Sequence, residues 1–183
     1  MIQTIEVEDL DMVEQSNDYK TYSLILHKIC RMINERANDL EVSRELYGKL
    51  GFVGSASELL KLMVLMRDAH KYGKSIQRFL FTMAERSLVV MSMYLNEACE
   101  SLCQKQLDLY EVKNRRYGNS FRECFVKDGY PYAFGHLQEK INRICSLASS
   151  GEVVEDEPLI DSYKDLLGYC VLTIIETYGT ERI

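Results

Sequence analysis

Three acidic residues near the C-terminus have the types and spacing that could hold a metal ion. Glu157, Asp161 and Asp165 follow one another at intervals of four residues, so on a helix they fall within a stripe about 80° wide. The same stripe continues through Gly168 and Leu172, and we expect a neighbouring helix to cover it. Carboxylates crowded on a sheltered face need a cation, and Mg²⁺ binds one or two carboxylates together with water and phosphate oxygens. The alternative is that acids in a first helical turn only offset the helix dipole.

A second group of residues could hold a phosphate. Lys113 and Arg116 are followed by Tyr117-Gly118 and, two residues later, by Ser120. Basic side chains, a glycine turn and a hydroxyl group together offer charge-assisted hydrogen bonds and backbone N–H donors to an anion. The alternative is a basic helix end in which Gly118 is the left-handed cap.

A third group lies between the other two. Glu139 and Arg143 are four residues apart and form an ordinary surface pair on a helix. Lys140 lies at the edge of an apolar stripe that includes Leu137 and Ile141, so it is better placed to reach a buried site.

The elements that must position these residues are all predicted to be helical. Only two prolines occur in 183 residues, which leaves room for long uninterrupted helices. Apolar residues at helical spacing predict helices over about 19–40, 55–73, 76–112, 135–148 and 158–178. No segment has a convincing strand pattern. The predicted fold class is all-α, a helical bundle.

The chain is predicted to form a single helical domain at 19–183 after an acidic lead-in at 1–18. The segment 71–76 is similar to 116–121, and each follows a predicted helix. Two similar helical halves, 19–104 and 105–183, packed as a pseudo-dimer would explain this similarity. Chance would explain it too, because Tyr-Gly is a common helix ending.

Composition excludes several classes of partner. The formal net charge is −6, so we expect no binding to bulk nucleic acid. The longest apolar run, 88–95, is far shorter than the roughly 20 residues needed to cross a bilayer, so we expect no membrane association. The six cysteines have no zinc-ligand spacing, and the N-terminal stretch is acidic rather than signal-like. We therefore expect reduced cysteines and a cytoplasmic location.

Taken in order, the three groups form a longer pattern. Its residues are Lys113, then Tyr117-Gly118-x-Ser120-Phe121, then Gln138-Glu139-Lys140-x-x-Arg143, and finally Glu157-x-x-x-Asp161-x-x-x-Asp165-Leu166-x-x-Tyr169. This pattern, over about 105–178, resembles the phage and bacterial nucleotide-modification-associated domain family, although Glu139 replaces that family's aspartate. The acidic helix is also similar to those of MazG-like all-α nucleotide pyrophosphohydrolases, which cleave nucleoside triphosphates with Mg²⁺. The two closely spaced acid clusters of those enzymes are missing here.

The resemblance and the acidic stripe together predict Mg²⁺-dependent binding and hydrolysis of a nucleotide or modified nucleotide. The predicted metal ligands are Glu157, Asp161 and Asp165, the predicted catalytic residues are Glu139, Asp161 and Asp165, and the predicted ligand-binding residues are Lys113, Arg116, Tyr117, Gly118, Ser120, Lys140 and Arg143. The alternative is a non-catalytic phage or bacterial protein that sequesters nucleotides or binds a host protein. Homo-oligomer formation is left open.

Overall fold

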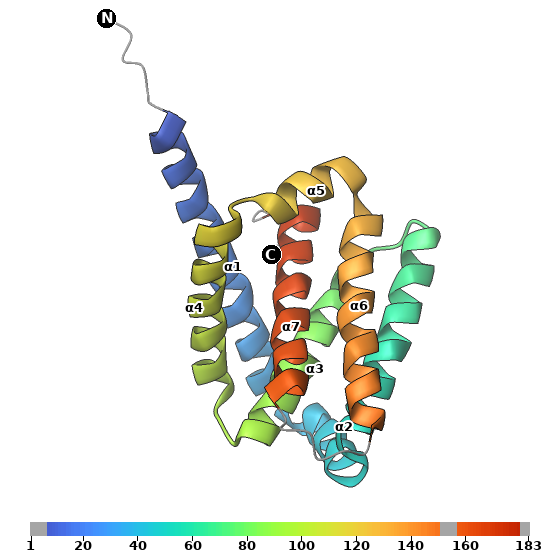
Figure 1. Ribbon diagram of the computed structural model, residues 1–183. Coiled ribbons are helices and arrows are strands. Elements are labelled where there is room, and N and C mark those ends of the chain that lie inside the picture. The colour runs from blue at the N-terminus through green and yellow to red at the C-terminus, as the bar shows by residue number, and fades with distance from the viewer. Residues whose placement is uncertain (1–6, 151–156, 180–183) are drawn as a thin grey trace, which may run out of the picture.

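The structure of the chain is a computed structural model that describes residues 7–150 and 157–179, with side chains described at 18–36, 41–150 and 158–179. The described residues form seven helices and no strand, so the predicted all-α fold is confirmed (Figure 1). The helices are α1 (Val7–Glu35), α2 (Ala37–Lys71), α3 (Gln77–Leu95), α4 (Cys99–Tyr117), α5 (Ser120–Asp128), α6 (Tyr130–Ser149) and α7 (Glu157–Tyr178). Within these ranges, none of the helices is both long and apolar enough to span a bilayer.

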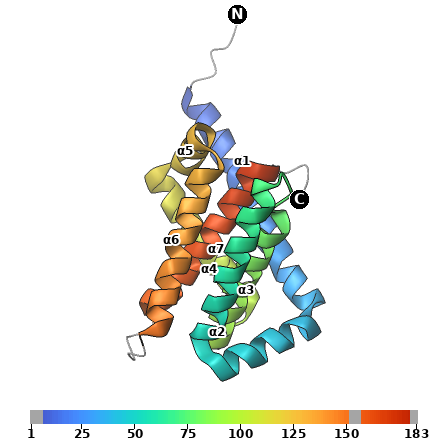
Figure 2. The same cartoon turned by 90° about the vertical axis from the view of Figure 1, so that its right-hand side faces the viewer.

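Helix α7 occupies the centre of the bundle and packs chiefly against α3 and α6 (Figures 1 and 2). Its predicted apolar stripe is buried at every position, namely Ile160, Tyr163, Leu167, Val171 and Ile174. Burial of these side chains is the main force that holds α7 in place, since each fully buried large apolar side chain contributes about 1.5–3 kcal/mol. Pro158 lies in the first turn of α7, as predicted, where its missing N–H is not needed.

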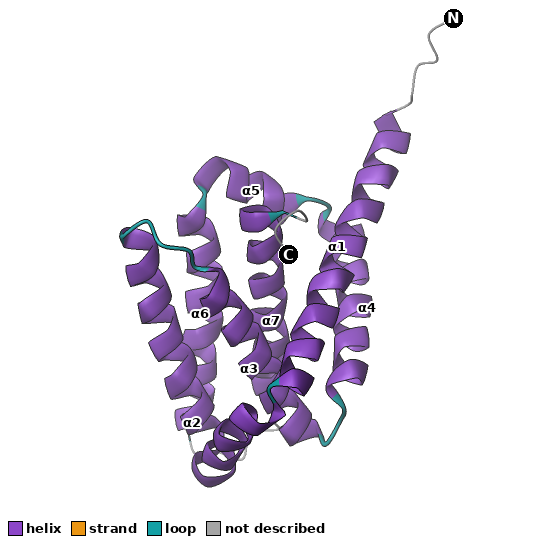
Figure 3. Cartoon of the chain, turned by 180° about the vertical axis from the view of Figure 1, so that it is seen from behind, coloured by secondary structure: helices purple, strands orange, loops and turns teal. Residues whose placement is uncertain are grey.

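The prediction of one long helix over 76–112 is wrong, because a turn separates α3 from α4. Asn96 adopts the left-handed conformation (φ 49°, ψ 46°), which asparagine tolerates better than most residues. The Ser92 hydroxyl donates to the Glu97 carbonyl oxygen at 2.6 Å and closes the turn. Ala98 is extended (φ −65°, ψ 143°), and α4 then runs back beside α1 (Figure 3).

Between the predicted helices 76–112 and 135–148, where no helix was expected, the chain forms a short helix, α5, after Gly118. Gly118 (φ 53°) and Gly129 (φ 64°) flank it in a backbone region that favours glycine. Their N–H groups donate to the carbonyl oxygens of Asn114 at 2.8 Å and Phe125 at 2.7 Å. Helix α5 therefore lies across the upper ends of α6 and α7, between two glycine turns (Figure 1).

The first two helices also differ from the predicted boundaries. Helix α1 already begins at Val7, inside the predicted lead-in, and ends at Glu35, before the predicted end near Leu40. The break expected between the predicted helices 19–40 and 55–73 is instead a kink inside α2, where Gly51 has φ 57° and ψ −148°. Because of this kink, the first part of α2 lies across the lower end of the bundle before the second part turns upward (Figure 2).

The two Tyr-Gly segments of the proposed repeat both end helices. Gly73 (φ 66°) follows α2 and Gly118 follows α4, which is a common way for a helix to end. The residues downstream differ in environment, because the Glu85 side chain is buried against Arg86, whereas Glu139 is exposed. A pseudo-dimer of two halves is not shown.

Candidate functional site

A pocket of about 440 Å³ opens between α1, α4, α5 and α7. This volume lies within the range of small-molecule sites. Among the lining residues, α7 contributes Lys164, Asp165, Gly168, Tyr169, Leu172, Ile175 and Glu176. Opposite it, α4 and the turn into α5 contribute Gln106, Leu109, Tyr110, Lys113, Asn114, Tyr117, Gly118, Asn119, Ser120, Phe121 and Arg122. From Asp165 onward, the predicted stripe that begins acidic and ends apolar is therefore one wall of this pocket.

A glycine on α7 allows the pocket's inner end to form. A Cβ atom at Gly168 would lie 3.1 Å from Gln106 Nε2 and 3.5 Å from the Tyr22 hydroxyl. The Gln106 amide instead donates to the Tyr22 hydroxyl and to the Lys164 carbonyl oxygen, both at 3.2 Å. These contacts join α1, α4 and α7 in the wall of the pocket.

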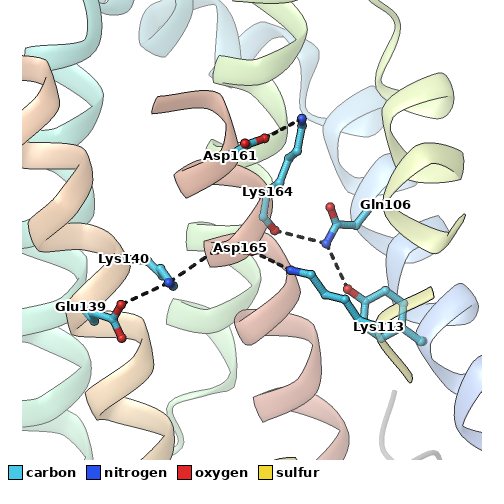
Figure 4. A network of polar contacts seen from close by, with 8 residues as sticks. Gln106, Lys113, Glu139, Lys140, Asp161, Lys164 and Asp165 are labelled. Atoms are coloured by element: carbon cyan, nitrogen blue, oxygen red, sulfur yellow. Dashed lines mark hydrogen bonds and ion pairs between the residues drawn. The ribbon is translucent and has the colours of Figure 1, made fainter. Parts of the chain in front are cut away.

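The three sequence groups converge on one carboxylate, that of Asp165. Lys113 Nζ donates to Asp165 Oδ1 at 2.8 Å, and Lys140 Nζ lies 3.4 Å from Oδ2 (Figure 4). Lys140 also pairs with Glu139 at 3.2 Å. Residues from α4, α6 and α7 thus form one ionic chain along the open side of the bundle.

The acidic stripe does not enter the pocket along its whole length. The Asp161 side chain is 54% exposed and pairs with Lys164 at 2.9 Å, whereas that of Asp165 is only 27% exposed. The shelter expected for the acidic stripe therefore holds for Asp165 and not for Asp161. The side chain of Glu157 lies outside the described residues.

The predicted phosphate ligands separate into two groups. Tyr117, Gly118 and Ser120 line the pocket with Lys113. Arg116, Lys140 and Arg143 lie outside its lining; the two arginines are exposed, whereas Lys140 contacts Asp165 from α6. The structure therefore brings together the turn residues and Lys113, and leaves these two arginines on the surface. Their assigned roles stay predictions.

The structure adds three charged residues that sequence reasoning missed. Arg122 on α5 donates through Nε to both carboxylate oxygens of Glu176, at 3.2 and 3.3 Å. Arg122 Nη2 also donates to Asp18 of α1 at 3.3 Å. Burial raises the pKa of Glu176, although Arg122 opposes the shift. Glu176 follows Asp165 by three helical turns, so continuation of the acidic stripe could have indicated it.

Aromatic rings form much of the remaining wall. Tyr22 and Tyr110 stack with their centroids 4.0 Å apart and an interplanar angle of 15°. Tyr169 stacks on His136 at 4.6 Å and 13°. Tyr117 is 64% exposed at the mouth, where its ring is accessible to a planar ligand.

The described residues do not fit a metal site built from protein ligands alone. No group of three or more His, Cys, Asp or Glu side chains is arranged to hold an ion within these residues. Lysines already neutralise Asp165 and Asp161, and Glu97, in the turn between α3 and α4, pairs with Lys105 at 2.7 Å. Binding of Mg²⁺ stays a prediction.

The part of the chain that holds these converging groups also matches a known family. Residues 113–177 match the family nucleotide modification associated domain 1. The predicted resemblance to the nucleotide-modification-associated family is thereby confirmed over this segment, and the likeness to MazG-like enzymes stays a prediction. The nucleotide modification associated domain 1 segment contains Lys113, Arg122, Lys140, Asp165 and Glu176. The opposite pocket wall, from α1 and the first part of α4, lies outside it. No curated protein and no solved structure matches the chain.

Proposed function

We propose that this pocket binds a nucleotide or modified nucleotide, with its phosphate group beside Lys113 and Lys164. The observation that carries the proposal is the arrangement of two lysines, Asp165 and a glycine turn around a pocket rich in aromatic residues. The match of residues 113–177 to a family associated with nucleotide modification supports the same class of ligand.

The lysine end of the pocket suits an exchangeable anion. The Lys113 side chain is 49% exposed, and ion pairs of such exposed groups contribute only about 0–1 kcal/mol. A phosphate group carries more charge than a carboxylate and has more acceptor oxygens, so it competes well with Asp165 for Lys113 and with Asp161 for Lys164.

The aromatic lining suits the base. Tyr117 and Phe121 stand beside the glycine turn, and a base stacked on an aromatic ring gains about 1–3 kcal/mol. A phosphate at Lys113 and a base against these rings place the nucleotide between α4 and α7.

Hydrolysis with Mg²⁺ is the finer proposal, and it depends on Asp165. Mg²⁺ typically takes one or two carboxylates and completes its shell with water and substrate phosphates, and Asp165 is the carboxylate beside the proposed phosphate position. Sequestration without turnover is the second candidate, and the pairing of Asp165 and Asp161 with lysines favours it. Binding of a host protein is the third alternative.

A screen of nucleoside mono- and triphosphates, with and without Mg²⁺, tests the proposal. A ligand present at a hundred times its Kd should raise the free energy of unfolding by about 2.7 kcal/mol, and chromatography of the same mixtures detects cleavage. Stabilisation with Mg²⁺-dependent cleavage supports an enzyme, and stabilisation without cleavage supports sequestration. No stabilisation by any nucleotide contradicts the proposal.

A further inference from the structure

The residues that line the two ends of the pocket carry opposite formal charge. At one end, Lys113 and Lys164 lie with the carboxylate of Asp165, and Lys164 also pairs with Asp161, which lies outside the lining. At the other end, two carboxylates, Asp18 and Glu176, lie with the single guanidinium of Arg122. Asp165 and Glu176 are eleven residues apart on α7, which corresponds to about 16 Å along the helix. The pocket therefore suits an elongated ligand with an anion at one end and hydrogen-bond donors at the other.

Glu176 is the acceptor best placed at the second end. Its side chain is only 12% exposed and lines the pocket. Both of its oxygens accept from Arg122 Nε, but an ionised carboxylate has about four lone-pair sites. The Glu176 carboxylate can therefore accept further hydrogen bonds. Arg122 contacts both Glu176 and Asp18, so it positions Glu176.

The edges of the nucleobases differ in how they match a carboxylate. Guanine presents two adjacent N–H groups, N1–H and N2–H, which can each donate to one carboxylate oxygen. Adenine and cytosine place one amino group beside a ring acceptor, and uracil and thymine place one N–H between two carbonyl oxygens. An acceptor-only group such as an ionised glutamate is repelled by these neighbouring acceptors.

We propose that Glu176, positioned by Arg122, binds the paired N–H donors of a guanine base whose phosphate lies at the Lys113 end of the pocket. This inference rests on the proposed function and specifies its ligand as a guanine nucleotide. In this orientation the base edge is the part of the ligand farthest from the phosphate, as the separation of the two charged ends requires.

Calorimetric titration of the full chain with GMP, IMP, AMP and dGMP tests the inference. IMP differs from GMP only by the missing N2 amino group, so the wild-type chain should bind GMP about 5- to 150-fold more tightly than IMP. AMP should also bind more weakly than GMP, and dGMP should bind about as tightly as GMP.

The Glu176→Gln variant adds a change of preference. Its amide offers one acceptor and one donor, which matches the mixed edge of adenine, so the ratio of GMP to AMP affinity should fall severalfold or more. Glu123→Gln, an exposed change on α5, should leave that ratio unchanged.

The outcomes separate this inference from the proposed function. Equal affinities for GMP, IMP and AMP in the wild-type chain would overturn the inference and leave nucleotide binding intact. A preference for GMP over dGMP without any base preference would overturn it too, because the carboxylates would then bind the sugar. Failure of every nucleotide to bind would overturn both. The comparison of GMP, IMP and AMP affinities uses the wild-type chain alone, so it does not depend on whether a variant folds.

Discussion

Lys113 and Asp165 are 52 residues apart in the sequence, yet Lys113 Nζ and Asp165 Oδ1 lie 2.8 Å apart. This ion pair connects α4 to α7 at the pocket. It also joins the basic glycine turn to the acidic helix, two features that sequence spacing alone leaves separate.

Asp165→Asn should have opposite effects with and without Mg²⁺. Without Mg²⁺, loss of the carboxylate releases Lys113 and Lys140 from their shared partner, so inorganic phosphate should bind more tightly, by a fewfold. Any Mg²⁺-dependent gain in nucleotide affinity should disappear. Calorimetry with phosphate and with nucleotide measures both effects. Weaker phosphate binding without Mg²⁺ would argue against an anion held at Lys113.

Gln106→Leu should destabilise the fold. The Gln106 side chain is buried, and its loss leaves the Tyr22 hydroxyl and the Lys164 carbonyl oxygen without this donor. We expect the free energy of unfolding to fall by about 1–3 kcal/mol, as measured by urea denaturation. Gln104→Leu is the matched control, since Gln104 is exposed on the same helix. Equal decreases in the free energy of unfolding in the two variants would show that the buried amide contributes no more to stability than the exposed one.

Stability should fall at mildly acidic pH because of His136. Burial lowers the pKa of His136, with Glu139 opposing the shift and Lys140 adding to it. The folded state disfavours the charged ring, so the contribution of neutral His136 to the free energy of unfolding is fully present above the usual histidine pKa of about 6.5. It declines as pH falls from there toward the lowered pKa.

His136→Phe should remove that part of the decline and keep an aromatic ring against Tyr169. The measurement is the free energy of unfolding at pH 7.5 and 5.5 in both proteins. The exposed change His27→Gln serves as a control that retains the wild-type decline. Identical declines in the wild-type and His136→Phe proteins would contradict the prediction.

The parts of the fold that local pattern determines were predictable. The apolar stripe of α7 and its end near Tyr178 follow from helical periodicity and the following glycine. The turn at Asn96 was not predictable in this way, because apolar residues continue through it and the deciding contact is a hydrogen bond from Ser92. The direction of α5 is likewise set by the glycine turns at its two ends, at Gly118 and Gly129.

The candidate site was predictable in part for the same reason. Lys113, the glycine turn and Asp165 carry recognisable local patterns, and all of them reach the pocket. The partnership of Asp18, Arg122 and Glu176 brings together three distant helices, and no local spacing encodes it. Arg116 has a suitable charge and sequence position, but its side chain lies outside the pocket lining, a difference that only the folded arrangement reveals.

Calorimetric titration of nucleotide into the wild-type, Lys113→Met and Arg116→Met proteins tests whether a nucleotide binds in the pocket with its phosphate at Lys113. Both variants remove one exposed positive charge from the last two turns of α4, so their effects on net charge and on stability should be alike. If the phosphate lies at Lys113, we expect saturable one-site binding to the wild-type protein, a loss of affinity of about tenfold or more in Lys113→Met, and little change in Arg116→Met. Equal affinity in all three proteins, or no binding to the wild-type protein, would contradict it.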